Sequence, residues 1–128
     1  LGGGFVEVGK TFKGQERMEA NQFYRVFEAI ERSIMQRGKA QIGDKTFLDG
    51  LHPAILTLSK ISDHTDVKDM LTLAASAAEA GAQATVGMVA KHGRMAIRGE
   101  DSRQYLDPGS VVAALLVRAF CDTLSMAL

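Results

Sequence analysis

Hydrophobic residues recur along most of this chain with the spacing of amphipathic helices. Between Phe23 and Ile34 they follow one another at intervals of three and four, which is one face of a helix, and Gly38 ends that segment. A second apolar pattern begins at Lys45 or Thr46 and runs to about Leu58. No segment alternates with a period of two, so the sequence predicts an all-α domain.

Two more helices are predicted in the second half of the chain. An alanine-rich stretch runs from about Val67 to Lys91 and stops at Gly93. Its small side chains let neighbouring helices approach closely, which predicts a central place in a bundle. A last helix follows Asp107 and continues to Leu128. Together with a short and weaker helical pattern from Phe5 to Phe12, this makes about five helices.

Cap residues and prolines indicate where the helices begin. Asn21 and Asp44 precede two of the apolar patterns and are predicted N-caps. Asp107 followed by Pro108 is a stronger start signal, because proline is favoured at the first helical position. Pro53 lies inside the second apolar pattern and predicts a kink just before it, because it removes one helical hydrogen bond.

Composition narrows the class of protein. The 128 residues suit one domain, 1–128, and fifteen basic residues balance fifteen acidic ones. This balance argues against a nucleic-acid or polybasic membrane binder. The longest apolar run, Val111 to Val117, falls short of the ~20 residues of a membrane span. A single cysteine, Cys121, favours a buried thiol and a cytoplasmic protein, and the start at Leu1 suggests a piece of a longer chain.

Two polar, glycine-marked segments, 37–46 and 93–109, join the predicted helices. Loops of this kind commonly carry binding sites. Taken singly, their residues have simple explanations: the glycines are turns, the aspartates are caps, Phe47 belongs to the core and Arg94 to the surface. Lys39 and Lys45 are either phosphate-neutralising or plain solvated lysines.

Taken together, the short motifs of these segments resemble a known family. In chain order they read Arg37-Gly38-Lys39-Ala40, Gly43-Asp44-Lys45-Thr46, Asp49, Gly93-Arg94, Gly99-Glu100, Ser102 and Asp107-Pro108-Gly109. The combination is similar to the L subunit of dihydroxyacetone kinase and to the C-terminal nucleotide-binding domain of single-chain dihydroxyacetone kinases. The resemblance implies an antiparallel barrel of eight helices, of which this chain would be the C-terminal two-thirds.

The resemblance also implies roles for particular residues. Gly38 would lie beside the adenine, and Phe47 would pack against the base. Arg94 would reach the phosphates, and the Asp107-Pro108-Gly109 segment would lie near the ribose and phosphates. No catalytic nucleophile is implied within this chain, because such a subunit works by positioning and charge neutralisation.

Cofactors and partners follow from the same resemblance. The ligand would be ADP or ATP with magnesium, and the acceptor would be dihydroxyacetone held on a K-type subunit or domain. A phosphoprotein M subunit would be the donor in one version of the system, and a homodimer is left open. The family's magnesium aspartates stand in a Gly-Asp-x-Asp-His-Gly motif, which is expected upstream of Leu1. Asp63-His64-Thr65-Asp66 only echoes it and is interpreted as a turn and cap.

The loop before the last helix departs from the family pattern. Asp101 and Tyr105 stand where the family has arginine and histidine. Arg98 and Arg103 are candidates to replace the lost charge. The departure keeps a second hypothesis open, a diverged non-catalytic regulatory or protein-interaction module. A third is a plain helical bundle that packs against a partner.

Overall fold

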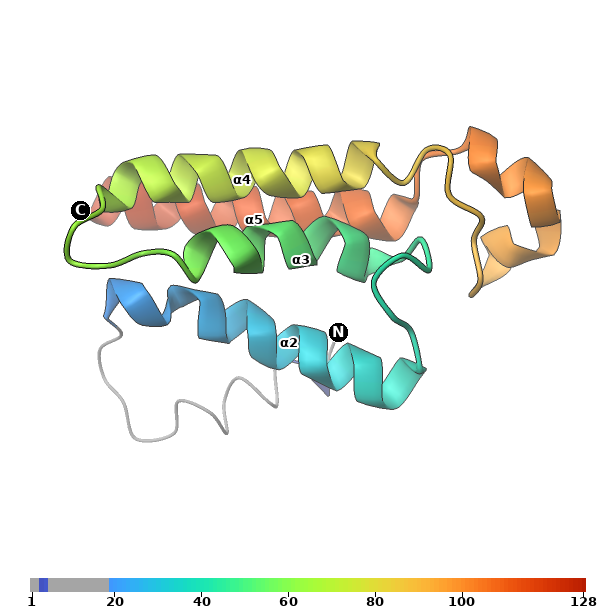
Figure 1. The fold of residues 1–128 in the computed structure, drawn as a ribbon, viewed down its shortest axis with the longest axis horizontal. Coiled ribbons are helices and arrows are strands. Elements are labelled where there is room, and N and C mark those ends of the chain that lie inside the picture. The colour runs from blue at the N-terminus through green and yellow to red at the C-terminus, as the bar shows by residue number, and fades with distance from the viewer. Residues whose placement is uncertain (1–2, 5–18) are drawn as a thin grey trace.

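A computed structural model describes residues 3–4 and 19–128. Its helices are η1 (Ala20–Gln22), α2 (Phe23–Gly38), α3 (Phe47–Leu58), α4 (Val67–Gln83), η2 (Arg94–Gln104) and α5 (Pro108–Ala127). Consecutive α-helices run in opposite directions (Figure 1). Within these described ranges the chain contains no strand, which confirms the all-α prediction. The helix predicted over 5–12 lies outside the described residues.

The core lies between α3 and its three neighbours, because α3 packs against α2, α4 and α5. The alanine-rich helix α4 packs closely on α3 and α5, and it buries Ala74, Ala75, Ala78 and Ala82 there. The expectation that α4 is the central helix is therefore wrong, since α3 takes that place. The small alanine side chains still let α4 approach its neighbours closely, as expected.

Glycines bring the helices together at one end of the bundle. A Cβ on Gly50 would overlap the carbonyl oxygen of Ser110 in α5, and a Cβ on Gly81 would overlap the carbonyl oxygen of Asp49. A Cβ on Gly109 would lie 3.2 Å from the amide nitrogen of Phe47. This end, where α3 and α5 begin and α4 finishes, is called the loop end from here on (right in Figure 1).

Aromatic rings fill the opposite end, called the turn end. Phe120 of α5 makes edge-on contacts with Phe23 and Phe27 of α2, at centroid distances of 6.1 Å and 4.8 Å. Ile61 follows α3 there and is also buried. Bulky side chains at one end and glycines at the other set how closely the helices approach along the bundle.

Capping differs from the predictions at two helices. Asp44 does not cap α3; Thr46 does, through its side-chain oxygen and the Leu48 amide at 3.2 Å. Asn21 does not cap α2, because the short η1 helix precedes α2 and Glu19 caps η1 with Gln22. The capping roles of two other aspartates, Asp66 for α4 and Asp107 for α5, are confirmed.

Two helix lengths are set by contacts that the pattern does not reveal. The helix predicted to reach Lys91 ends at Gln83, and Gly87 then adopts a positive φ of 98°. In contrast, α3 continues as one helix through Pro53. Proline cannot bond the carbonyl of Asp49, four residues earlier, and Gly81 of α4 packs against that carbonyl instead.

The last helix, α5, combines high hydropathy with partial burial. By length and composition alone it could cross a membrane, and 28% of its most apolar window is buried. Cys121 is buried on its inner face, as predicted. Burial raises the pKa of this thiol to about 11, so the thiol stays protonated and unreactive near neutral pH.

Candidate functional site

The two polar segments singled out in the sequence meet at the loop end. The Lys91 amide donates to the carbonyl oxygen of Asp44 at 3.2 Å. The His92 ring nitrogen Nε2 lies 2.8 Å from the Asp44 carboxylate. Asp44, predicted as a cap, thus joins two loops that are separated by almost fifty residues of sequence. Hydrogen bonding to His92 is the main reason that the pKa of Asp44 lies below its usual range.

Lys45 lies between the same two segments and is buried. Its ammonium nitrogen donates to the carbonyl oxygens of Met88 at 3.2 Å and Ser102 at 2.6 Å, and also to that of Tyr105. All three N–H donors of the ammonium are therefore occupied by backbone. The interpretation of Lys45 as a solvated or phosphate-binding lysine is wrong, because no donor is left for another ligand.

Two buried hydroxyl groups hold the rest of the second segment. The Ser102 hydroxyl accepts from the Ala90 amide at 2.9 Å and donates to the Gly99 carbonyl at 2.6 Å. The Thr85 hydroxyl accepts from the Asp107 amide at 2.9 Å. Ser102 belongs to the motifs quoted above, whereas sequence reasoning missed Thr85 because it was placed inside the overlong alanine helix.

The N-termini of α3 and α5 lie against each other. Gly109, in the first turn of α5, packs on the amide nitrogen of Phe47, the first residue of α3. Asp49 reaches back to accept from the Thr46 amide at 2.9 Å and the Gly43 amide at 2.6 Å. Within the described part of the chain, no hydrogen bond is donated by the Phe47 or Gly109 amide, as is usual in the first turn of a helix.

Asp107 caps α5 from a buried position. Its carboxylate accepts from the Ser110 amide at 2.7 Å, and Pro108 follows as the first residue of the helix. Burial raises the pKa of Asp107 above its usual range; the nearby charge of Asp49 acts in the same direction, whereas the Ser110 amide and Lys45 oppose it. The structure therefore brings the Asp107-Pro108-Gly109 segment next to Phe47 at the surface where α3 and α5 begin, with Asp107 itself buried there.

Gly38 lies apart from that surface, at the end of α2. It lines a pocket of 280 Å³ together with Gly3, Gly4 and Arg37. Gly3 touches α2 so closely that a Cβ there would lie 2.6 Å from the Arg37 side chain. The left-handed residue that ends α2 is Lys39 and not Gly38.

Arg94 opens the η2 helix, two residues after His92. Its side chain is exposed, and it forms no hydrogen bond or ion pair with the described residues, nor does any hydrogen bond join it to Gly38, Phe47 or the 107–109 segment. The two arginines considered as replacements in the diverged loop are already engaged: Arg103 binds Glu100 at 2.6 Å and the Gly87 carbonyl, and Arg98 stacks over the Tyr105 ring at 4.8 Å.

A metal site is not formed by the described residues, which contain no group of three or more His, Cys, Asp or Glu side chains able to hold an ion. The three aspartates of the loop end, Asp44, Asp49 and Asp107, each accept hydrogen bonds from backbone amides or His92 instead. These carboxylates therefore do not form a magnesium site among the described residues.

Comparison with known proteins decides the family. The model of the DAK2 domain matches residues 1–122. This chain belongs to the DAK2 domain family. The resemblance stated from the sequence motifs is thereby confirmed.

Relatives of this DAK2 domain include subunits and parts of kinases. The chain is 28% identical over 123 residues to the ADP-binding subunit DhaL of PEP-dependent dihydroxyacetone kinase 2 from Listeria innocua, covering 96% of the chain and 57% of the relative. The corresponding ADP-binding subunit from Escherichia coli is 30% identical over 115 residues, 89% of the chain and 55% of that subunit. Human triokinase/FMN cyclase is 38% identical over 93 residues, 72% of the chain and 16% of the enzyme. The DAK2 domain described here thus spans little more than half the length of the bacterial subunits.

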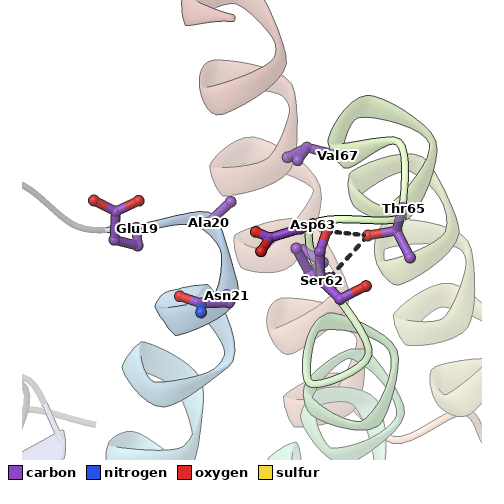
Figure 2. A pocket seen from close by; sticks show the side chains of 8 residues that line it. Glu19, Ala20, Asn21, Ser62, Asp63, Thr65 and Val67 are labelled. Carbon is purple, nitrogen blue, oxygen red and sulfur yellow. Dashed lines mark hydrogen bonds between the residues drawn. The ribbon is translucent and has the colours of Figure 1, made fainter.

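A pocket of 220 Å³ lies at the turn end of this DAK2 domain, away from the surface just described. Figure 2 shows that its polar side chains come from η1 and from the turn between α3 and α4. The hydrogen bonds drawn there join only Ser62 and Thr65, three residues apart. This pocket contains none of the residues implicated by the family resemblance, and the Asp63–Asp66 segment is a turn and cap, as predicted.

Proposed function

We propose that this DAK2 domain binds ADP or ATP at its loop end and serves as the nucleotide-binding part of a dihydroxyacetone kinase-type phosphotransferase. One observation carries the proposal: the N-termini of α3 and α5 abut, with the amides of Phe47 and Gly109 unpaired among the described residues. Two helix N-termini attract phosphate through free N–H groups and through the positive ends of their dipoles. The two bacterial relatives are ADP-binding subunits, which supports this assignment.

In this proposal each predicted residue keeps a distinct role. The 107–109 segment and the start of α3 contact the phosphates and ribose, and Phe47 offers an apolar face to the base. Arg94, exposed and free of partners among the described residues, swings its guanidinium onto phosphate oxygens. Gly38 borders the adenine through the pocket that it lines with Gly3 and Gly4.

The chemistry proposed for the domain is positioning and charge neutralisation. The phosphoryl group passes to dihydroxyacetone or another small ketose held on a K-type partner subunit or domain, in the cytoplasm. Magnesium accompanies the nucleotide and neutralises phosphate charge, and we place its ligands outside the described residues. Either ATP or a phosphoprotein M subunit supplies the phosphoryl group.

The second candidate function is a non-catalytic regulatory or interaction module that retains nucleotide binding. It is favoured by the diverged loop, where Tyr105 stacks with Arg98 and Arg103 is held by Glu100. The two candidates differ in a phosphotransfer assay with the partner subunit: binding of nucleotide without transfer supports the regulatory module.

Calorimetric titration of the full-length protein with Mg-ADP tests the proposal. A ligand at a hundredfold excess over its Kd should add about 2.7 kcal/mol of stability, so thermal unfolding gives an independent reading. Arg94→Ala is expected to weaken Mg-ADP binding about tenfold, or about 1.4 kcal/mol, while the stability of the free protein changes by less than about 0.5 kcal/mol.

Arg32→Ala is the matched control, because Arg32 is also exposed but pairs with Glu28 on α2. It should bind Mg-ADP like the wild type. Failure of the wild-type protein to bind Mg-ADP would refute the proposed function, and equal affinity of Arg94→Ala and wild type would remove Arg94 from the site.

A further inference from the structure

Lys45 combines a side chain shielded from solvent with an unfavourable backbone conformation. It is 2% exposed, and its φ of 65° lies in the left-handed region. Among the described residues, only one other non-glycine residue has a positive φ, Lys39, which is exposed at the end of α2. A left-handed backbone is unfavourable for an ordinary L-residue, so the surroundings of Lys45 must compensate for it.

The contacts of the ammonium group explain what compensates. Its partners, the carbonyls of Met88, Ser102 and Tyr105, are 43, 57 and 60 residues away in sequence. No carboxylate touches the ammonium, and Asp107 acts on it only through its nearby charge. A buried lysine without a contacting counter-ion is costly, and burial lowers the pKa of Lys45. An apolar side chain would avoid that cost, but it could not bond three carbonyls at once.

The three carbonyls belong to the segment that joins α4 to α5, and this segment carries both Arg94 and Asp107. Lys45 itself directly precedes Thr46, the cap of α3, and Phe47. Its side chain therefore connects the start of α3 to the segment that presents the arginine. The exposed bond between His92 and Asp44 runs in parallel, but its solvent exposure makes it the weaker link.

We propose that Lys45 is a positioning residue, whose buried ammonium holds the 85–107 segment against the start of α3 and so sets the spacing between the two halves of the nucleotide site. This inference rests on the proposed function, and it assigns to Lys45 an action through other residues and no contact with the nucleotide. It predicts that loss of the ammonium loosens the segment locally and weakens nucleotide binding, although the helical core stays folded.

The test compares Lys45→Met with Ile61→Ala in the full-length protein. Lys45→Met keeps the bulk of the side chain and removes the donors. Ile61→Ala creates a cavity at the turn end, where Ile61 is 5% exposed, and it supplies a variant destabilised for an unrelated reason. Both variants are measured under conditions where urea titration shows each to be folded.

Two readouts separate positioning from general stability. Hydrogen exchange at the Ala90 and Tyr105 amides, which bond to Ser102, should accelerate at least tenfold in Lys45→Met, whereas amides at the centre of α4 keep their protection. The Kd for Mg-ADP should rise at least tenfold in Lys45→Met and stay within twofold of wild type in Ile61→Ala.

The results discriminate between the inference and the function on which it rests. If Lys45→Met binds Mg-ADP like the wild type, or if Ile61→Ala loses as much affinity, the positioning role is overturned and the proposed function stands. If the wild type does not bind Mg-ADP, the proposed function falls and this inference falls with it. Unchanged exchange at Ala90 and Tyr105 overturns the inference whatever the affinity.

Discussion

The two ends of the bundle are built from different kinds of hydrogen bond. At the turn end, bonds such as those between Ser62 and Thr65 join residues three apart and lie in solvent. At the loop end, Lys45 and Asp44 bond residues 43 to 60 positions away, and several of the groups are buried. Local bonds shape a turn by themselves, whereas long-range buried bonds hold separate segments in one geometry.

The difference in hydrogen bonding indicates which end of this small helical domain carries the candidate site. Both ends have pockets and polar side chains, so neither feature distinguishes them. Burying a polar group costs free energy unless the group is hydrogen-bonded to well-placed partners. Lys45, Asp107 and Ser102 incur this cost at the loop end only, which is the end where the family resemblance independently places the nucleotide.

The largest expected change in the free energy of unfolding comes from disturbing the close contact between α3 and α5 at the loop end. Gly50→Ala places a methyl group against the Ser110 carbonyl and 3.1 Å from the Ala113 Cβ. Because these are backbone and packed helix atoms, α5 must move away, and overpacking of this kind typically costs about 1–3 kcal/mol. Urea unfolding measures the change.

The matched control is Gly38→Ala, since no atom lies within 4 Å of a Cβ at that position. Alanine there should leave the free energy of unfolding unchanged or raise it by up to about 1 kcal/mol. Equal stability of Gly50→Ala and Gly38→Ala would show that the helices at the loop end are not in close contact.

A smaller change in stability is expected when the two capping aspartates, Asp107 and Asp66, are each replaced by asparagine. Asp107 and Asp66 make the same bond to the amide three residues on, but Asp107 is buried and Asp66 is exposed. Asparagine caps a helix as well as aspartate does. Asp66→Asn should therefore change stability by less than about 0.5 kcal/mol, while Asp107→Asn should make the free protein more stable at pH 7 because it removes a buried charge.

The higher stability expected of Asp107→Asn should depend on pH, because proton binding and folding are linked. The pKa of Asp107 is raised in the folded state, so between the unfolded and folded pKa values the folded protein binds more protons, and stability falls as pH rises. Asp107→Asn has no carboxylate to ionise and does not lose stability in this way. The difference in free energy of unfolding between variant and wild type should therefore disappear below the unfolded pKa of about 3.9. Urea unfolding from pH 3 to pH 7 follows the difference; an advantage that persists at the acid end would contradict the burial argument.

The smallest effect is expected from the exposed bond between His92 and Asp44. His92→Ala should lower stability by less than about 1 kcal/mol. Because hydrogen bonding to His92 is the first cause of the lowered pKa of Asp44, NMR titration should find a higher Asp44 pKa in the variant. Thr65→Ala at the turn end is the control and should leave the Asp44 titration unchanged.

Much of the fold could be predicted from local pattern, and the failures have a common cause. Asp107 with Pro108 and Asp66 are caps as predicted, because the amides that they bind lie only three residues away in sequence. Asp44 has the same local appearance, but Lys91 and His92 bind it from far along the chain. The end of α4 was predicted eight residues too late, since Thr85 and Gly87 act through contacts with the segment around Asp107 and Arg103.

The sequence by itself determined the all-α class, the order of the main helices and the family resemblance that the comparisons confirm, whereas the residues that it assigns to the nucleotide site stay a prediction. Helical periodicity and short motifs are local, so they can be read directly. Only the tertiary structure decided that Lys45 is buried, that the starts of α3 and α5 touch, and that the loop end is held by long-range bonds. Hydropathy assigns a lysine to solvent, and only the three carbonyls brought to it by folding reverse that expectation.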